Sequence, residues 1–233
     1  MSSMHSEKIS ILIVDDHALV RAGVTRILVD EPDLMVIGEA SSGEKAIEFI
    51  TMHMPDIVIM DARMPGIGGI EATHRLLAMY PDLKIIAISA VVSGAIPSQM
   101  LRAGARSFLT KNVSVDELCK AIRMVQSGQR YVTPDVATQM AVDPFNKNGG
   151  SLFDKLSRRE MQIAQMLTDG KKVSRIAEYL SLSPKTVYSY RYRIFEKLGI
   201  HSDVELTILA VKDGLAGDAR ELDELPRFSH FAG

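Results

Sequence analysis

The chain has 233 residues, of which 46% are hydrophobic and 24% are charged, a composition typical of soluble globular proteins with room for about two domains. Its formal net charge of −2 excludes a uniformly basic nucleic-acid-binding protein, but the charge is unevenly distributed. Residues 155–214 contain 11 Lys or Arg and 7 Asp or Glu, whereas residues 1–154 carry a net charge of −4 and residues 216–233 one of −2. The two halves are therefore predicted to have different partners.

The single cysteine, Cys119, excludes an intrachain disulfide and fits a reducing compartment. The N-terminus lacks the basic segment followed by a long apolar run that marks a secretion signal. No apolar stretch is long enough to cross a bilayer. We therefore expect a soluble cytoplasmic protein with no membrane partner.

The first half of the chain alternates between strand and helix patterns. Apolar runs rich in β-branched residues predict five strands, at residues 9–14, 35–40, 56–60, 83–88 and 107–109. Helical spacing or N-cap signals predict a helix after each strand, at residues 19–28, 42–50, 69–79, 97–103 and 114–128. This alternation predicts an α/β unit with a doubly wound, five-stranded parallel sheet, right-handed crossovers and helices on both faces.

Polar residues stand at the ends of four of these strands. Asp15 and Asp16 follow the first strand, Asp61 the third, Ser89 the fourth and Lys111 the fifth. Because the carboxyl ends of parallel strands lie on one edge of the sheet, these side chains are predicted to converge. Three carboxylates would repel one another unless a hard cation such as Mg²⁺ bound them. With a lysine and a hydroxyl beside it, Asp61 is a candidate nucleophile for phosphoryl transfer.

These motifs resemble those of one known family. The segments VDDH at 14–17, MDARMPG at 60–66, ISA at 88–90 and FLTK at 108–111 are similar to those of a response-regulator receiver domain. The resemblance covers residues 7–127 and implies a flavodoxin/CheY-like fold. It implies that Asp61 is the phosphoacceptor and that a sensor histidine kinase is the phosphodonor.

The same resemblance assigns further roles at this edge. It implies that Mg²⁺ is bound by Asp15, Asp16, Asp61 and the backbone carbonyl of Arg63. It makes Ser89 the switch hydroxyl and Lys111 the phosphate partner. For Phe108 two roles stay open, a rotating switch aromatic and simple packing against the last helices, since it lacks the hydroxyl of tyrosine. Asn112 replaces the proline that follows the lysine in many receivers, so no cis bond is assumed.

The segment 128–152 is interpreted as a linker because glycine, proline and asparagine interrupt its periodicity. It contains one short helix predicted at 134–140 and a domain boundary predicted at 146–151. Residues 153–215 then form a predicted module of four helices, beginning near residues 157, 173, 183 and 202. Such short helices are marginal alone, so they are expected to pack together.

The third helix of this module is predicted to bind DNA. It follows the tight turn at 181–183 and therefore resembles the second helix of a helix-turn-helix. Its basic and hydrogen-bonding side chains suit the major groove of double-stranded DNA. The residues predicted to contact DNA are Lys185, Thr186, Tyr188, Ser189, Tyr192 and Arg193.

This module is similar to the LuxR-type helix-turn-helix of NarL/FixJ-family regulators, and residues 185–195 are similar to those of the GacA/UvrY/LetA subgroup. The resemblance implies that Tyr188, Ser189 and Tyr192 face base edges, while Lys185 and Arg193 meet phosphate. Arg191 departs from the wider family, in which an apolar residue is usual. Candidate residues of a dimer contact, which alternatively form simple core, are Val204, Thr207, Ile208 and Val211.

These features predict a transcription regulator, not an enzyme, that is switched by phosphorylation of Asp61 and binds DNA as a homodimer. One alternative is a metal-dependent phosphohydrolase with Asp61 as nucleophile, although Arg63 would be a poor general acid. A second alternative is a constitutive DNA-binding protein whose receiver does not switch. Residues 216–233 are predicted to be a disordered tail with no assigned role.

Overall fold

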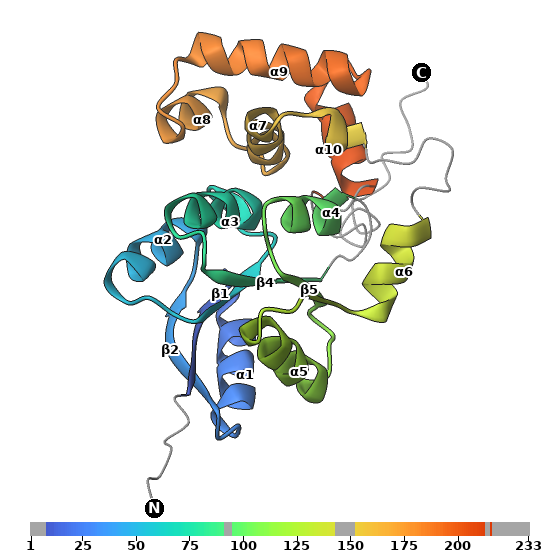
Figure 1. Ribbon diagram of the computed structural model, residues 1–233. Helices are drawn as coiled ribbons and strands as arrows, with labels where there is room; N and C mark the ends of the chain where they lie inside the picture. The colour runs from blue at the N-terminus through green and yellow to red at the C-terminus, as the bar shows by residue number, and fades with distance from the viewer. Residues whose placement is uncertain (1–7, 91–94, 143–151, 213–214, 216–233) are drawn as a thin grey trace, which may run out of the picture. The chain divides into compact units, whose positions relative to one another are not determined.

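The computed structural model describes residues 8–90, 95–142, 152–212 and 215. The chain divides into two compact units, Met1–Gly150 and Ser151–Gly233 (Figure 1). The boundary predicted at 146–151 and the tail at 216–233 lie outside the described residues. Within the described ranges, no helix combines the length and the apolar character needed to span a membrane.

The first unit is built on a parallel sheet with strand order β2-β1-β3-β4-β5-β6. Its strands are β1 (Ile9–Val14), β2 (Leu34–Ala40), β3 (Ile57–Asp61), β4 (Lys84–Ser89), β5 (Ser107–Thr110) and β6 (Tyr131–Val132). The first five confirm the prediction to within one or two residues. The sixth strand was not predicted, because two residues are too few to show alternation.

Helices cover both faces of this sheet. They are α1 (Ala18–Val29), α2 (Gly43–Met52), α3 (Gly68–Met79), α4 (Ala95–Arg102), α5 (Val115–Gln126) and α6 (Pro134–Val142). Helices α1 and α5 lie on one face and α2, α3 and α4 on the other (Figure 1). The doubly wound architecture predicted from the sequence is therefore confirmed, and so is the short helix predicted after residue 134.

The central strands read as apolar runs because both of their faces are buried. All five residues of β3 are buried, as are the last four of β1. Ile11, Ile59 and Leu109 belong to the core between the sheet and the α1/α5 layer. A central strand that is covered on both faces holds its last residue, Asp61, in a rigid frame.

The strand β6 is attached to α5 by a side-chain hydrogen bond. The Tyr131 hydroxyl donates to Glu117 Oε1 at 2.7 Å, and this bond raises the pKa of Tyr131 to about 12. Ser114 and Glu117 have the spacing of a capping box, but only half of that box forms. Ser114 Oγ accepts from the Glu117 backbone N–H at 3.3 Å, while the Glu117 carboxylate binds Tyr131 instead.

The second unit is all helical. It contains a short 3-10 helix, η2 (Leu152–Lys155), and then α7 (Arg158–Thr168), α8 (Val173–Tyr179), α9 (Pro184–Leu198) and α10 (Asp203–Lys212). Ser183 caps α9, and Gly199 ends it in the left-handed conformation. The four predicted helices are confirmed, and their core includes the fully buried Ile163, Val187 and Ile194.

A complete capping box begins α7, and a lysine of α9 binds the glutamate of that box. Glu160 accepts from the Ser157 backbone N–H at 2.7 Å and from Lys197 Nζ at 2.6 Å. Burial of the Glu160 carboxyl raises its pKa, but the bonds to Lys197 and Ser157 outweigh burial, so the pKa lies below its usual value. One buried carboxylate thus joins two helices.

Glu160→Gln is expected to lower the free energy of unfolding at pH 7 by about 1–3 kcal/mol, because the hydrogen bond from Lys197 loses its negatively charged acceptor. A depressed carboxyl pKa gives stability that is present above the unfolded-state value, near 4.5, and is lost as the pH falls through the folded-state value. Urea unfolding at pH 7 and pH 3 should therefore show a smaller difference from wild type at pH 3. Equal differences at the two pH values would contradict this account.

Candidate functional site

The carboxyl edge of the sheet gathers the polar residues that the sequence places at strand ends. The Asp61 carboxylate, whose residue is 2% exposed, lies at the end of β3. Its Oδ2 atom is 2.7 Å from Lys111 Nζ, and its Oδ1 atom accepts from the Arg63 backbone N–H at 3.0 Å. Asp15, 1% exposed, has its Oδ2 atom 2.6 Å from the same lysine nitrogen. Lys111 therefore joins the two buried carboxylates.

The loop after β1 adds a third carboxylate and a histidine. His17 Nδ1 is 2.9 Å from Asp16 Oδ1 and 3.2 Å from Asp15 Oδ1, and the His17 backbone N–H donates to Asp15 Oδ1 at 2.8 Å. A hydrogen bond from α1 also holds the backbone of this loop, because Arg21 Nη1 donates to the Asp15 carbonyl at 2.7 Å. The sequence analysis did not predict that His17 contacts these carboxylates, and the only signal for it was its position directly after two aspartates.

The charges at this edge are not balanced by protein groups alone. Burial, aided by the nearby Asp15 charge and opposed by Lys111, raises the pKa of Asp61 to about 6. Burial also favours the neutral form of Lys111, but its hydrogen bonds to Asp15 and Asp61 outweigh this, so its pKa lies above the usual value. Three carboxylates face one charged lysine, which leaves an excess of negative charge.

This excess predicts how stability depends on pH. Folding raises the pKa of the Asp61 carboxyl from 3.8 in the unfolded chain to about 6. The free energy of unfolding therefore falls as the pH rises between these two pKa values. Without divalent cations, the first unit is expected to lose of the order of 3 kcal/mol of its free energy of unfolding between pH 4 and pH 7 through Asp61. Urea unfolding with and without MgCl₂ checks this: Mg²⁺ should stabilise the unit at pH 7 and have little effect at pH 4. The same Mg²⁺ effect at both pH values would contradict it.

The donor set suits Mg²⁺. One ligand atom from each of Asp15, Asp16, His17 and Asp61 lies within 4.8 Å of the others. Mg²⁺ takes oxygen ligands and keeps several waters, which matches three carboxylates at an edge where Asp16 is still partly exposed. A cation bound there would offset the negative charge of this acidic cluster.

The loop after Asp61 is held close to the sheet by a glycine. A Cβ atom at Gly69 would lie 1.9 Å from the Asp61 carbonyl oxygen, so only glycine lets α3 begin this near to β3. Arg63, whose carbonyl is predicted to bind the metal, lies in the same loop, and its backbone N–H is already bound to Asp61. The bond between Lys111 and Asn112 is trans, as expected without proline.

Ser89 and Phe108 lie on the same face of the sheet. Ser89 ends β4 opposite Thr110, and Phe108 pairs with Ala87, so strand alternation puts both side chains on the face of α3 and α4. Both residues are fully buried. Phe108 is therefore packed in the core, beside the small side chain of Ala87.

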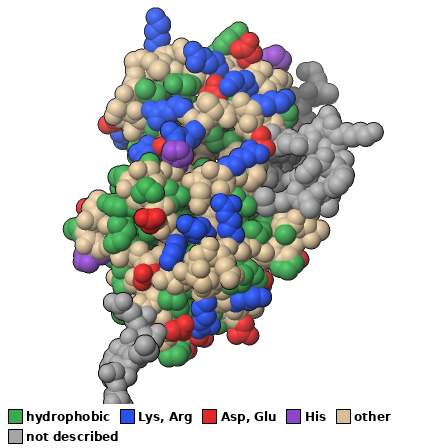
Figure 2. Space-filling model, in the orientation of Figure 1, with side chains coloured by type: hydrophobic (Ala, Val, Ile, Leu, Met, Phe, Trp, Pro, Cys, Tyr) green, Lys and Arg blue, Asp and Glu red, His purple; other side chains and the backbone are tan. Residues whose placement is uncertain are grey.

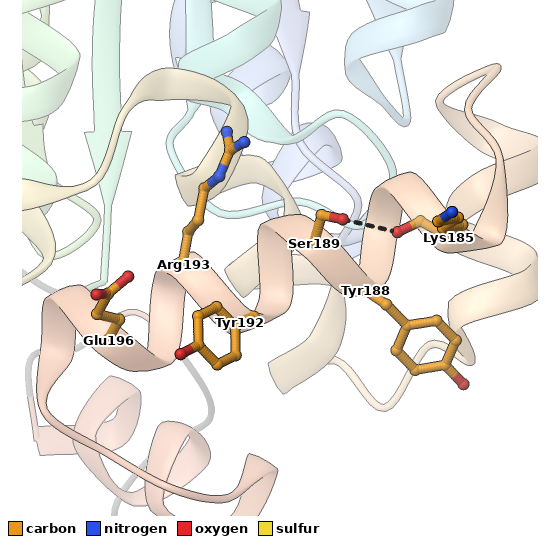
Figure 3. A pocket seen from close by; sticks show the side chains of 6 residues that line it. All are labelled: Lys185, Tyr188, Ser189, Tyr192, Arg193 and Glu196. Atoms are coloured by element: carbon orange, nitrogen blue, oxygen red, sulfur yellow. Dashed lines mark hydrogen bonds between the residues drawn. The ribbon is translucent and has the colours of Figure 1, made fainter.

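The exposed face of α9 forms the second candidate site. An open groove of about 490 Å³ lies along it. Its lining side chains all come from this helix (Figure 3): Lys185, Tyr188, Ser189, Tyr192, Arg193 and Glu196. Tyr192 is 71% and Tyr188 55% exposed, which is unusual for large aromatic rings without a partner. On the visible face of this unit, Lys and Arg side chains are numerous (Figure 2).

Two residues of α9 have contacts that bear on their predicted roles. Thr186 Oγ1 is 2.7 Å from Ser183 Oγ, so its hydroxyl takes part in the cap of the helix. Arg191 points away from the groove and forms a two-bond ion pair with Asp203, the first residue of α10. On α10, Val204 and Ile208 are exposed, while Thr207 and Val211 are half-buried.

Comparison with known families identifies both units. Residues 11–123 match the family described as "Response regulator receiver domain", and residues 154–210 match "Bacterial regulatory proteins, luxR family". The first match includes Asp15, Asp61 and Lys111, and the second includes the α9 groove.

Relatives match over nearly the whole chain. Response regulator GacA of Pseudomonas protegens is 49% identical over 207 residues, which is 89% of this chain and 97% of that protein. Response regulator UvrY of Escherichia coli is 49% identical over 208 residues, covering 89% and 95%. A solved complex of the two-component response regulator RcsB with DNA is 26% identical, covers 87% of this chain and 98% of that chain, and has a TM-score of 0.56.

Proposed function

Because the chain belongs to the response regulators, with a receiver domain followed by a luxR-family regulatory domain, we propose that phosphorylation of Asp61 controls its binding to DNA. The observation that carries this proposal is the position of Asp61. Its carboxylate lies at a sheet edge, bound to Lys111 and beside Asp15. A sensor histidine kinase would be the phosphodonor, and the cytoplasm would be the site of action.

The residues at the carboxyl edge of the sheet would have different roles in phosphoryl transfer. An Asp61 oxygen attacks the phosphorus, and the bond from phosphorus to the donor nitrogen breaks. Lys111 is placed to balance the charge of the transferring group, since its ammonium already lies 2.7 Å from Asp61. Asp15, Asp16, Asp61 and the Arg63 carbonyl would hold Mg²⁺, which when bound supplies charge stabilisation for the transferred oxygens.

The switch is proposed to run through Ser89 and Phe108. Phosphorylation adds roughly two negative charges at Asp61, and these can accept a hydrogen bond from Ser89. Because Ser89 and Phe108 share one face of the sheet, a shift of Ser89 changes the space open to the Phe108 ring. The surface formed by α4 and the end of β5 would then change. Phosphorylation would thereby shift the equilibrium of this region between two conformations.

Helix α9 is proposed to lie in the major groove of double-stranded DNA, with the side chains of the α9 groove facing the DNA. Tyr188, Ser189 and Tyr192 would face base edges, and Lys185 and Arg193 would bind phosphate. Thr186 would act through the helix cap and its backbone, because its hydroxyl is engaged by Ser183. The solved RcsB complex with DNA, which matches 87% of this chain, supports DNA as the partner of this unit.

A homodimer is proposed as the DNA-bound form. The exposed apolar side chains of Val204 and Ile208 on α10, flanked by Thr207 and Val211, supply a surface that a second copy would bury. Two copies related by a two-fold axis would then read a two-fold-related site.

The experiment that tests the proposal is DNA footprinting with and without acetyl phosphate and MgCl₂. We expect donor-dependent protection of a two-fold-related site. Equal protection with and without the donor would instead support constitutive DNA binding. The phosphohydrolase alternative is set aside, because the relatives are response regulators with DNA-binding domains.

A further inference from the structure

The recognition helix α9 carries an arginine that the DNA interface does not use. Arg191 lies four residues after the buried Val187 and three residues after the exposed Tyr188, so it stands at the border between the buried and the exposed side of the helix. Its side chain is only 30% exposed, although arginine is normally a surface residue. A half-buried charged group is stabilised by a partner within the domain.

That partner is Asp203, and the geometry of the pair is specific. Arg191 Nε lies 2.7 Å from Asp203 Oδ1, and Arg191 Nη2 lies 2.7 Å from Asp203 Oδ2. The guanidinium also stacks over the Phe195 ring, with its carbon 4.8 Å from the ring centroid. Two parallel bonds and a stacked ring fix the orientation of the guanidinium, which a single lysine bond could not do.

The pair joins two helices that share α7 as a neighbour, although only α9 also packs against α8. Helix α10 packs chiefly against α7, while α9 packs against both α7 and α8. Asp203 is the first residue of α10 and directly precedes the exposed Val204, the start of the proposed dimer surface. The link therefore runs from the middle of the recognition helix to the helix proposed to hold the second copy.

We propose that the Arg191–Asp203 ion pair sets the orientation of α9 relative to α10, and thereby the separation of the two DNA half-sites that the dimer accepts. This inference rests on the proposed function. Helix α9 has 15 residues and is about 22 Å long, so a rotation of about 10° about one end displaces the other by about 4 Å. That displacement is about one base-pair step, so Arg191 and Asp203 are positioning residues for site spacing.

The test uses the full-length chain with acetyl phosphate and MgCl₂. Duplexes are first selected from a random-sequence library by the wild-type chain. Fluorescence anisotropy then gives affinities for a single half-site and for paired half-sites whose separation changes one base pair at a time. The variants are Arg191→Met, Asp203→Asn and the charge-exchanged double variant R191D/D203R. Lys197→Met is the matched control, because it removes the ion pair of α9 to α7 and leaves α10 untouched.

Arg191→Met and Asp203→Asn are each expected to reduce the preference for the best separation over its neighbours by about fivefold. Their affinity for a single half-site should stay within about twofold of wild type. The double variant should recover part of the preference, and Lys197→Met should keep all of it. Recovery by charge exchange is a result that mere loss of stability does not produce.

Two outcomes overturn the inference while the proposed function stands. One is an unchanged separation preference in both single variants. The other is a weaker single half-site affinity in Arg191→Met but not in Asp203→Asn, which would make Arg191 a direct DNA contact. If the wild-type chain selects no DNA, or binds paired half-sites no better than one, the proposed function fails and the inference fails with it.

Discussion

Asp61→Asn is expected to abolish phosphoryl uptake from acetyl phosphate and to remove all donor-dependent tightening on DNA. The amide is nearly isosteric with the carboxylate, but it is a poor nucleophile and carries no charge to attract a cation. For the wild-type chain we expect tightening of at least about tenfold, or about 1.4 kcal/mol. Phosphate-affinity electrophoresis and anisotropy on the footprinted site measure the two effects.

Asp82→Asn is the matched control for this substitution. Asp82 is an exposed aspartate in the turn before β4, at the opposite edge of the same sheet. The Asp82→Asn variant should retain both phosphoryl uptake and the donor-dependent increase in DNA affinity. If Asp61→Asn still tightened on DNA with the donor, the switch would not depend on Asp61, and the proposed mechanism would be refuted.

Lys111→Met should lower the free energy of unfolding of the receiver unit by about 3 kcal/mol at pH 7 without Mg²⁺. The substitution leaves Asp15 and Asp61 buried without the ammonium that lies 2.6 and 2.7 Å from them. The pKa of Asp61, already raised to about 6, should rise further. Below that pKa the proton replaces the missing cation, so the loss should shrink as the pH falls to 4.

Urea unfolding of the full chain at pH 4 and pH 7, with and without MgCl₂, measures this effect. Mg²⁺ should restore more stability to Lys111→Met than to wild type, because the variant has one more uncompensated negative charge. Phosphoryl uptake should also be slower. Lys84→Met is the control, since Lys84 donates to Gln126 at the other edge of the sheet. An equal loss of stability at both pH values would show that Lys111 acts through packing alone.

Much of the fold follows from patterns that are local in sequence. The apolar runs of β1 and β3 fixed strand positions to within about a residue, and Ser183 with Pro184 fixed the start of α9. Such signals succeed because the interactions behind them join residues at most four positions apart. Local patterns were less accurate where a side chain also had a more distant partner. Glu117 has the spacing of a cap residue, but its carboxylate binds Tyr131, which is 14 residues away.

The candidate site was predicted less directly. That Asp15, Asp61, Ser89 and Lys111 stand at strand ends is a sequence observation, and parallel topology was enough to predict that they share an edge. The sequence could not show that Lys111 joins Asp15 to Asp61, or that Arg21 fixes the loop from behind, because these contacts depend on the twist of the sheet.

The amino-acid sequence by itself determined the order of strands and helices, the doubly wound class, the four C-terminal helices and which polar residues stand at the strand ends. Tertiary structure alone decided that β6 extends the sheet, that the Thr186 hydroxyl serves the cap and that Arg191 binds Asp203. The physical reason is range. Periodicity and capping act within one or two turns of a helix, whereas the partner of a polar or charged side chain depends on which distant segments the packed core brings within hydrogen-bond distance.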